Sequence, residues 1–275
     1  FTKRYLNTTH NDIFFADAVI LVEGPAERML IPHFIKNFHP LLDNCYITIL
    51  EIGGSHAHRL KPLIEKLGLI TLIITDLDSQ EKYSDTSSVP PKDKYKKCQP
   101  KIKNHQITNN DTLKNWNPKL TEIDELIKLD FDGKLLTDYP IRVAYQSEID
   151  LSGVKVYPYT FEDALVLENI EKFKAIEAIS GLLKKMVKAT NEDDVNIVAE
   201  KTYQAINSEG VKKAEFPVKD AQNDVNYISS TSEIPFLFDG KKVFGAQPFF
   251  RNFFDMSASD LGKYSHIYQL DMESI

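Results

Sequence analysis

Three apolar runs constrain the fold of this chain most, because each of them ends abruptly in acidic residues or glycines. The runs are Ala16 to Val22, Cys45 to Ile52 and Leu69 to Thr75. Each is long enough for a strand that is buried on both faces. The segments between the runs have apolar residues at helical spacing, and Pro25 suits the first turn of the first helix. This order predicts an α/β fold, in which helices cover both faces of a parallel sheet.

Carboxylates follow the first and third of these predicted strands. Glu23 comes directly after the first strand, and Glu27 lies in the first turn of the helix that follows. Asp76 and Asp78 come directly after the third strand, and Glu162 begins a later helix. Because parallel strands end at one edge of a sheet, we expect these acids to converge there. Converging carboxylates repel one another and raise one another's pKa unless cations neutralise them.

A donor set made only of oxygen atoms favours Mg²⁺ or Mn²⁺ over zinc. Two such ions, roughly 4 Å apart, can activate a water molecule and stabilise the leaving oxygen in phosphodiester cleavage. We expect Ca²⁺ to act as a non-catalytic substitute. The alternative is that the acids are helix caps and surface charges, since Glu27 in a first helical turn also interacts favourably with the helix dipole.

The second predicted strand ends in Gly53, Gly54 and Ser55, which have two interpretations. The glycines allow a tight turn. They also allow backbone N–H groups to approach a phosphate, so these three residues are candidate DNA contacts. His56 and His58 follow, but only one residue separates them and no cysteine or third histidine is near, which argues against a zinc site.

Residues 79 to about 120 break the pattern of strands and helices. This segment has two adjacent prolines, a lysine-rich stretch and few apolar residues, and we interpret it as a long, mobile insertion. Its lysines belong either to a solvated loop or to a basic arm across the DNA backbone. In the second case Ser79 and Lys97 are candidate DNA contacts. We expect Trp116 to anchor the segment to the core rather than to stack on a base.

The composition narrows the class of protein. A net charge of −7 argues against a broadly cationic nucleic-acid binder, but an acidic metal site is itself a source of negative charge. Two cysteines exclude a disulfide scaffold and a cysteine-rich zinc module. No apolar run is long enough to span a bilayer and no signal peptide is evident, so we expect a cytoplasmic protein without membrane contact. Because the chain begins at Phe1 without a methionine, we expect it to be a fragment or a processed product.

Three segments resemble the core motifs of a TOPRIM domain, the fold shared by topoisomerases, bacterial primases and small nucleases. They read AVILVEGPAERMLIP, EIGGSHAHRLKPLIEKLG and LIITDLDS. Their sequences are most similar to the OLD (overcoming lysogenization defect) family of nucleases. Within that family they resemble the class whose TOPRIM domain has the conventional Glu and Asp-x-Asp motifs. TNNDTLKNW, within the insertion, and Lys-Ala-Glu-Phe at residues 213–216 also resemble family elements. The likeness covers about residues 16–169, apart from the insertion.

The resemblance implies a divalent-metal-dependent DNA endonuclease that nicks or cleaves by two-metal phosphodiester hydrolysis. Its catalytic residues would include Lys213, which would approach the scissile phosphate and stabilise transition-state charge. The alternative for Lys213 is a solvated lysine beside Lys212. Asp163 is an alternative to Glu162 as a ligand. The metal ligands that the resemblance implies are Glu23, Glu27, Asp76, Asp78 and Glu162, of which Glu23, Asp76 and Asp78 are also counted as catalytic.

Proteins of this family usually carry an N-terminal ABC-type ATPase domain before the TOPRIM region. No Gly-rich Walker loop occurs here, so the chain resembles the isolated C-terminal catalytic region. The resemblance also implies a role in phage defence or DNA repair, a UvrD-like helicase partner and homo-oligomerisation through the missing regions. We expect a TOPRIM domain at 1–169, a helical subdomain at 170–222 and an aromatic-rich segment at 223–275 that completes the core.

Other functions fit the sequence less well. A topoisomerase needs a nucleophilic tyrosine on a separate domain, and no tyrosine here has a recognisable context of that kind. A primase would need zinc-binding cysteines. A receiver-type phosphoacceptor domain does not fit the Glu-Gly turn after the first strand. The remaining alternative is a metal- and DNA-binding module that acts mainly on a partner and is inactive without its ATPase region.

Overall fold

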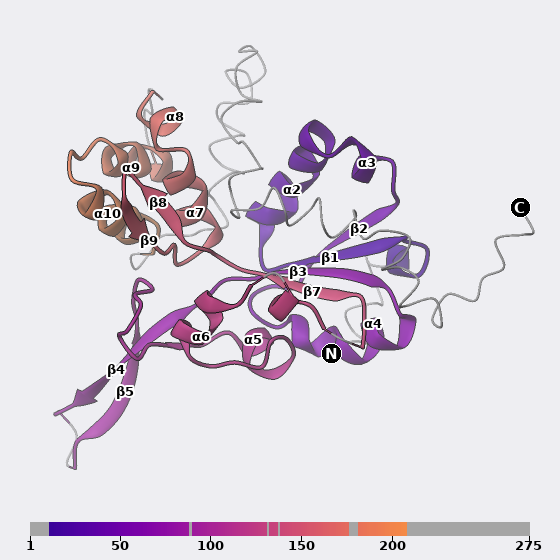
Figure 1. Ribbon diagram of the computed structural model, residues 1–275, viewed down its shortest axis with the longest axis horizontal. Helices are drawn as coiled ribbons and strands as arrows, with labels where there is room; N and C mark the ends of the chain where they lie inside the picture. Colours follow the sequence, from indigo (N-terminus) through magenta and orange to yellow (C-terminus); the bar gives the residue numbers. More distant parts are fainter. Residues whose placement is uncertain (1–10, 88–89, 131, 137, 176–180, 208–275) are drawn as a thin grey trace, which may run out of the picture.

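The computed structural model describes residues 11–87, 90–130, 132–136, 138–175 and 181–207. Its centre is a four-stranded parallel sheet with the strand order β2-β1-β3-β7 (Figure 1). The strands are β1 (Ala18–Val22), β2 (Ile47–Glu51), β3 (Ile70–Ile74) and β7 (Ile141–Ala144). The predicted α/β fold with a parallel sheet is therefore confirmed, and the three predicted N-terminal strands end within two residues of the observed ones.

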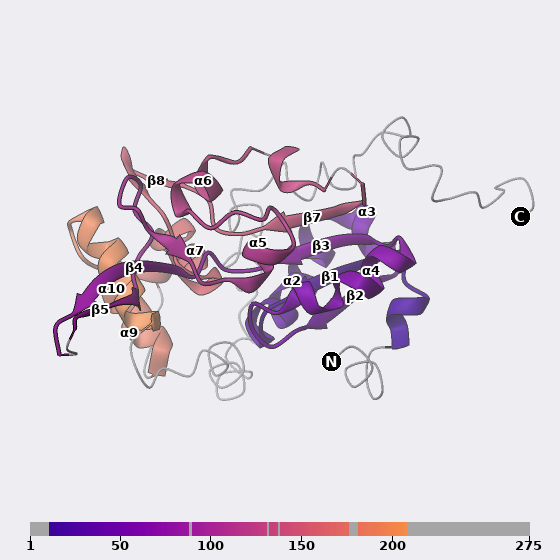
Figure 2. The ribbon, with the colours of Figure 1, turned by 90° about the horizontal axis from the view of Figure 1, so that it is seen from below.

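Successive residues of the central strands point to opposite faces of the sheet, and each face has its own apolar core. Ile20 and Val22 pack on one face with α2 and α7, whereas Val19 and Leu21 pack on the other face. Trp116 is fully buried in that second core, as predicted. The first face is covered by α2 (Pro25–Phe38), with α3 (Pro40–Asp43) beside it, and by α7 (Phe161–Glu168) (Figure 1). The second face is covered by two short 3-10 helices and three α-helices (Figures 1 and 2). These are η1 (Asn11–Phe14), η2 (Ala57–Leu60), α4 (Lys61–Leu67), α5 (Asp111–Asn115) and α6 (Ile123–Lys128).

The order of the strands creates a topological switch point at the carboxyl ends of β1 and β3. From β1 the chain crosses through α2 to β2, whereas from β3 it continues to β7 on the opposite side. The connections from these two neighbouring strands therefore leave in opposite directions. In open parallel sheets such a switch point leaves room for a ligand outside the carboxyl ends of the strands.

The segment expected to be a mobile insertion has regular structure. β4 (Ser79–Asp85) and β5 (Lys92–Lys97) form an antiparallel hairpin that projects from the body of the molecule, and β6 (Ile107–Thr108) pairs with the base of β4 (Figure 1). The lysine-rich stretch is therefore largely a strand. Lysines and acidic residues of the two strands form ion pairs across the hairpin. The resulting ion pairs are Lys82–Asp93 at 2.7 Å, Lys94–Asp85 at 2.5 Å and Lys96–Glu81 at 2.8 Å.

Helices make up most of the described residues after β7. The hairpin of β8 (Ile149–Leu151) and β9 (Val154–Val156) packs with α7 and α10 around Leu167 and Val198. Lys213 and the segment 223–275 lie outside the described residues. In the described ranges, no helix combines the length and the apolar character that a membrane span requires. The remaining elements are η3 (Asp132–Lys134), α8 (Ile170–Lys174), α9 (Gly181–Thr190) and α10 (Val195–Asn207).

Candidate active site

Glu23 lies at the switch point and is held by the segment that follows β3. Its Oε1 atom accepts hydrogen bonds from the backbone N–H of Asp76 at 3.1 Å and from Nδ2 of Asn110 at 3.0 Å. The hydroxyl of Thr75 also donates to this oxygen. The ends of β1 and β3 therefore bring the Glu23 carboxylate to the backbone of Asp76, although 53 positions separate the two residues in the sequence.

Asp76 connects the strand ends to α7. Its Oδ1 atom accepts hydrogen bonds from Nε2 of Gln146 at 2.6 Å and from the backbone N–H of Phe161 at 3.0 Å. Phe161 is the first residue of α7, so this bond places the N-terminus of that helix, where Glu162 lies, at the same edge of the sheet. Asp78 has a φ of 47°, in the left-handed region, which turns the chain out of the strand direction.

Burial and mutual repulsion raise the pKa of two acids at this edge. Burial and, as the second cause, the Asp78 carboxylate raise the pKa of Glu23 to about 7. Burial likewise raises the pKa of Glu27 to about 8, with the carboxylates of Glu162 and Glu23 as additional causes. Within the described part of the chain, neither Glu23 nor Glu27 forms an ion pair with a lysine or arginine.

Gly24 provides the space that Glu27 occupies. It is the N-cap of α2, with an extended backbone at φ −144°. A Cβ atom at this position would lie 3.3 Å from Oε2 of Glu27, which is closer than most real contacts. Glu27 itself is 5% exposed, as is Glu162 in the first turn of α7. The two helix starts thus hold buried carboxylates next to the strand ends.

The acids fit divalent cations by their chemistry. Their donors are carboxylate oxygens, which Mg²⁺ and Mn²⁺ prefer. Bound cations would also relieve the repulsion that raises the pKa of Glu23 and Glu27. Among the described residues, however, no three His, Cys, Asp or Glu side chains form a ready metal-binding group in this structure.

The glycine turn has a different role from a phosphate contact. The backbone N–H groups of Gly53 and Gly54 both donate to the carbonyl oxygen of Glu23, each at 3.0 Å. Their φ values of 74° and 97° explain why glycine suits both positions. Because these N–H groups are already engaged, the turn fastens the end of β2 to Glu23. The carbonyl of Ser55 accepts a hydrogen bond from the Thr112 hydroxyl at 2.9 Å, which joins the same turn to α5.

The other candidate DNA contacts have contrasting surroundings. Ser79 is fully buried and its hydroxyl donates to the carbonyl of Cys98, so it supports the base of the hairpin and does not face a ligand. Lys97, by contrast, is exposed at the end of β5. The imidazole of His56 lies 3.8 Å from Asp111 in α5, and burial lowers the pKa of His58.

Asp163 accepts hydrogen bonds from Tyr159 and from Asn207 of α10. Its Oδ2 atom accepts a hydrogen bond from the backbone N–H of Tyr159 at 3.1 Å. Both of its carboxylate oxygens also lie 3.2 Å from Nδ2 of Asn207, at the end of α10. These contacts give Asp163 a structural role, whereas the charge of Glu162 acts on Glu27. Of the two residues, Glu162 is therefore the better candidate ligand.

Asn110 and Gln146 are buried members of the site that the sequence did not single out. Asn110 is 0% exposed and Gln146 is 1% exposed. Asn110 lies in the TNNDTLKNW segment, where its place before a short helix is typical of an N-cap. The N-cap position does not by itself predict a contact between Asn110 and Glu23. Gln146 follows β7 and carries no sequence signal, because an isolated glutamine after a strand is common in loops.

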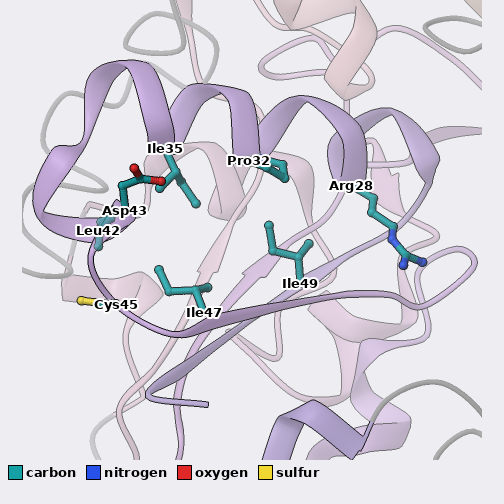
Figure 3. Close-up of a pocket in the computed structure, with 8 residues that line it drawn as sticks. All are labelled: Arg28, Pro32, Ile35, Leu42, Asp43, Cys45, Ile47 and Ile49. Atoms are coloured by element: carbon teal, nitrogen blue, oxygen red, sulfur yellow. The ribbon is translucent and has the colours of Figure 1, made fainter. Parts of the chain in front are cut away.

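An apolar pocket lies elsewhere, between α2 and the edge strand β2. Figure 3 shows Pro32 and Ile35 of α2 facing Ile47 and Ile49 of β2 across this space. Ligand sites usually combine such an apolar wall with several converging polar groups. Here Arg28, at the rim, lies 3.9 Å from Glu51 in an ion pair. The acids with raised pKa are at the carboxyl edge instead, so we assign the chemistry to that edge.

Comparison with known proteins matches the part of the chain that contains β1, β2, β3 and the acids that follow β1 and β3. Residues 14–78 match the TOPRIM domain of overcoming lysogenization defect protein-like proteins. Endonuclease GajA of Bacillus cereus (strain HuB5-5) is 28% identical over 240 residues, which cover 85% of this chain and 31% of the relative. Endonuclease GajA of Bacillus cereus (strain VD045) is 30% identical over 80 residues, or 29% of this chain and 14% of that protein. The chain thus spans about a third of the first relative's length.

Solved structures include the C-terminal region of the Xanthomonas campestris pv. campestris OLD protein, at 18% identity and a TM-score of 0.33, with 80% of this chain and 100% of that chain covered. The C-terminal region of the Burkholderia pseudomallei OLD protein has 19% identity and a TM-score of 0.35, with 74% and 85% covered. The matched residues 14–78 include the three strands of the switch point and four of the five acids. Residues 14–78 are therefore similar to an OLD-like TOPRIM domain, and 85% of the chain aligns with an endonuclease GajA.

Proposed function

We propose that this chain is the catalytic region of a metal-dependent DNA endonuclease. The observation that carries the proposal is the pair of buried acids Glu23 and Glu27, whose pKa values are raised and which lack cationic partners among the described residues. Buried charges of one sign are costly to a fold and are most often found where a function requires them. The name endonuclease for the homologous GajA proteins supports DNA as the substrate.

Two cations bound at this edge would polarise a phosphodiester and lower the pKa of the attacking water. The chain's contribution is to hold its carboxylates in place. Glu23 is fixed by three donors to one oxygen, and Asp76 is fixed by Gln146 and by the start of α7. The acids that would hold the cations are Glu23, Glu27, Asp76, Asp78 and Glu162. We further propose that Lys213 approaches the scissile phosphate and stabilises its developing charge.

The surroundings of this reaction follow from the same proposal. Lys97 on the projecting hairpin is a candidate contact for the DNA backbone, which lysines bind without sequence preference. We propose that an ABC-type ATPase domain precedes this region in the full protein and that a UvrD-like helicase and further copies of the chain are partners. Phage defence or DNA repair in the cytoplasm is the biological setting that we propose.

A second function is a metal- and DNA-binding module that needs its ATPase region for activity. The spacing of the acids favours this alternative, because no three of them are gathered for a metal in the described residues. Binding of DNA or of an ATPase partner would then have to bring the carboxylates closer together. The two proposals differ in whether this chain cleaves DNA alone.

Cleavage of supercoiled plasmid with Mg²⁺, Mn²⁺ or EDTA tests the proposal, with Asp76→Ala beside the unchanged chain. We expect metal-dependent nicking or linearisation that the Asp76→Ala variant loses. Glu171→Gln is the matched control, because Glu171 lies on α8 with its side chain 84% exposed. If the folded chain binds Mn²⁺ and DNA but does not cleave, the module is the better description. Cleavage that persists in EDTA would contradict the metal-dependent mechanism.

A further inference from the structure

Asn110 connects the inserted segment to the acidic edge through a single side chain. Its Oδ1 atom accepts hydrogen bonds from the backbone N–H groups of Thr112 at 2.9 Å and Leu113 at 3.1 Å, and so caps α5. Its Nδ2 atom donates toward Glu23 Oε1 at 3.0 Å, Thr75 Oγ1 at 2.6 Å and the carbonyl of Asp76 at 2.8 Å. One half of the amide thus serves the helix, and the other half serves the strand ends.

The bonds of Asn110 form a short relay to Glu23. Nδ2 of Asn110 donates to the Thr75 hydroxyl, and that hydroxyl donates to Oε1 of Glu23. Nδ2 also reaches the same Oε1 directly. Because Asn110 is fully buried, these bonds act in a low-dielectric environment, where hydrogen bonds to a carboxylate are stronger than at the surface.

Gln146 makes a parallel set of contacts with the segment that follows β3. Its Nε2 atom donates to Oδ1 of Asp76 at 2.6 Å, and its Oε1 atom accepts from the backbone N–H of Leu77 at 2.8 Å. It too is buried, at 1% exposed. Each of the two amides therefore ties one strand-end carboxylate to backbone that flanks the site.

The inserted segment is itself fastened to the glycine turn. The Thr112 hydroxyl donates to the carbonyl of Ser55 at 2.9 Å and accepts from the N–H of His58 at 3.3 Å. The start of α5 is thus held from two sides, by the turn after β2 and by the strand ends of β1 and β3. Such a fixed start gives the Asn110 amide a defined direction.

We propose that Asn110 and Gln146 are positioning residues, which hold Glu23 and Asp76 in the orientation that a divalent cation requires. This inference rests on the proposed metal site and adds residues that act on it through the carboxylates. Partners that hydrogen-bond to ligating carboxylates typically change metal affinity 10–100-fold when they are removed. A merely structural amide would change the stability of the fold and leave the metal affinity of the folded protein unchanged.

The Asn110→Ser variant separates these two roles. Serine caps helices about as well as asparagine, so the bonds to the start of α5 can be kept. Its hydroxyl is too short to reach Glu23, and the substitution adds no charge. Asn115→Ser is the matched control, because Asn115 lies on the same helix and is exposed, with its amide bonded to the carbonyl of Asp111.

The experiment is calorimetric titration of the 275-residue chain with MnCl₂, after circular dichroism has shown that each variant is folded. We expect Asn110→Ser to weaken Mn²⁺ binding at least tenfold, whereas Asn115→Ser should bind like the unchanged chain. Gln146→Met, which is neutral and similar in size, is the second variant and should weaken Mn²⁺ binding as well. If Asn110→Ser does not fold, Gln146→Met still tests the positioning role.

The outcomes distinguish this inference from the function on which it rests. If the unchanged chain binds Mn²⁺ and the folded amide variants bind it equally well, the positioning role is wrong and the metal site stands. If the unchanged chain does not bind Mn²⁺, the proposed metal site fails and the positioning role fails with it. A variant that loses thermal stability in EDTA but keeps its Mn²⁺ affinity would also contradict the inference.

Discussion

The carboxyl edge of the sheet and the β4–β5 hairpin are adjacent in sequence, but the surroundings of their carboxylates differ. At the edge, carboxylates are buried beside one another, and burial raises the pKa of Glu23 and Glu27. On the hairpin, acids face lysines in solvent, and hydrogen bonds from Lys94 and Lys82 lower the pKa of Asp85 and Asp93. The acids of the hairpin form ion pairs with lysines of the same hairpin. Glu23 and Glu27 at the edge have no such compensation among the described residues, and a bound cation could provide it.

This difference has an energetic meaning. Exposed ion pairs contribute little to stability because water already solvates both charges. Buried like charges lower stability, because neither solvent nor a partner compensates them. The edge is therefore the part of the molecule where a substitution that removes charge should stabilise the fold and impair the function at the same time. The following predictions test that contrast.

Neutralising an acid should have very different consequences in the two regions. Glu23→Gln is expected to lower metal-dependent DNA cleavage at least a hundredfold, because it removes charge from the point where the strand ends meet. Glu81→Gln removes the same charge from the hairpin and its bond to Lys96, and is expected to change cleavage less than threefold. Initial rates of plasmid nicking at saturating Mg²⁺ measure both. Equal losses in the two variants would contradict the contrast.

Glu27→Gln is expected to stabilise the metal-free chain by about 1–3 kcal/mol at pH 8. The folded-state pKa of about 8 is above the ordinary value of 4.5, so the folded state binds more protons than the unfolded state. The stability that this group contributes is complete below about pH 4.5 and is lost as the pH rises through 8. Urea unfolding in EDTA between pH 5 and pH 9 measures this.

The pH dependence of the Glu27→Gln effect is its own control. The two proteins should be most alike in stability near pH 5, and the difference should grow as the pH rises and be largest above pH 8. Addition of Mn²⁺ should stabilise the unchanged chain more than the variant, since cations relieve the repulsion among the carboxylates. A stability difference that is independent of pH would show that the raised pKa of Glu27 is not its cause.

Gly24→Ala should impair metal activation several-fold without unfolding the chain. The backbone at Gly24 is extended, which alanine adopts without strain, but the new Cβ would lie 3.3 Å from Oε2 of Glu27. The Mg²⁺ concentration for half-maximal cleavage measures the displacement of that carboxylate. Wild-type activation by Mg²⁺ would mean that Glu27 moves aside at no cost, or that it does not bind the cation.

Asp93→Asn should have the smallest effect. It breaks the exposed ion pair with Lys82 and the weak contact with Ser84 on the hairpin. Because the pair is fully solvated, we expect no measurable change in the thermal midpoint at physiological salt. Differential scanning calorimetry checks this. A drop comparable to that of a core substitution would mean that the hairpin charges are not merely surface charges.

The sequence alone determined the sheet and the acids on it. Three apolar runs that end in Glu23, Gly53 and Asp76 are visible without any structure, because a strand buried on both faces must be continuously apolar. The position of Asp76 and Glu23 at one edge also followed, since parallel strands share the direction of their ends. Glu162 was expected at this edge from its place at the start of a later helix and from the family resemblance, and its carboxylate is one cause of the raised pKa of Glu27.

The tertiary structure decided which side chains hold these acids and which backbone groups are already engaged. Asn110 meets Glu23 across 87 positions, and Gln146 meets Asp76 across 70. The N–H groups of Gly53 and Gly54 are used by Glu23 and are not offered to a phosphate. Strand patterns arise from local periodicity, so a sequence displays them. Hydrogen bonds between distant loops depend on how the loops pack, and a single polar residue carries no period that would reveal its partner.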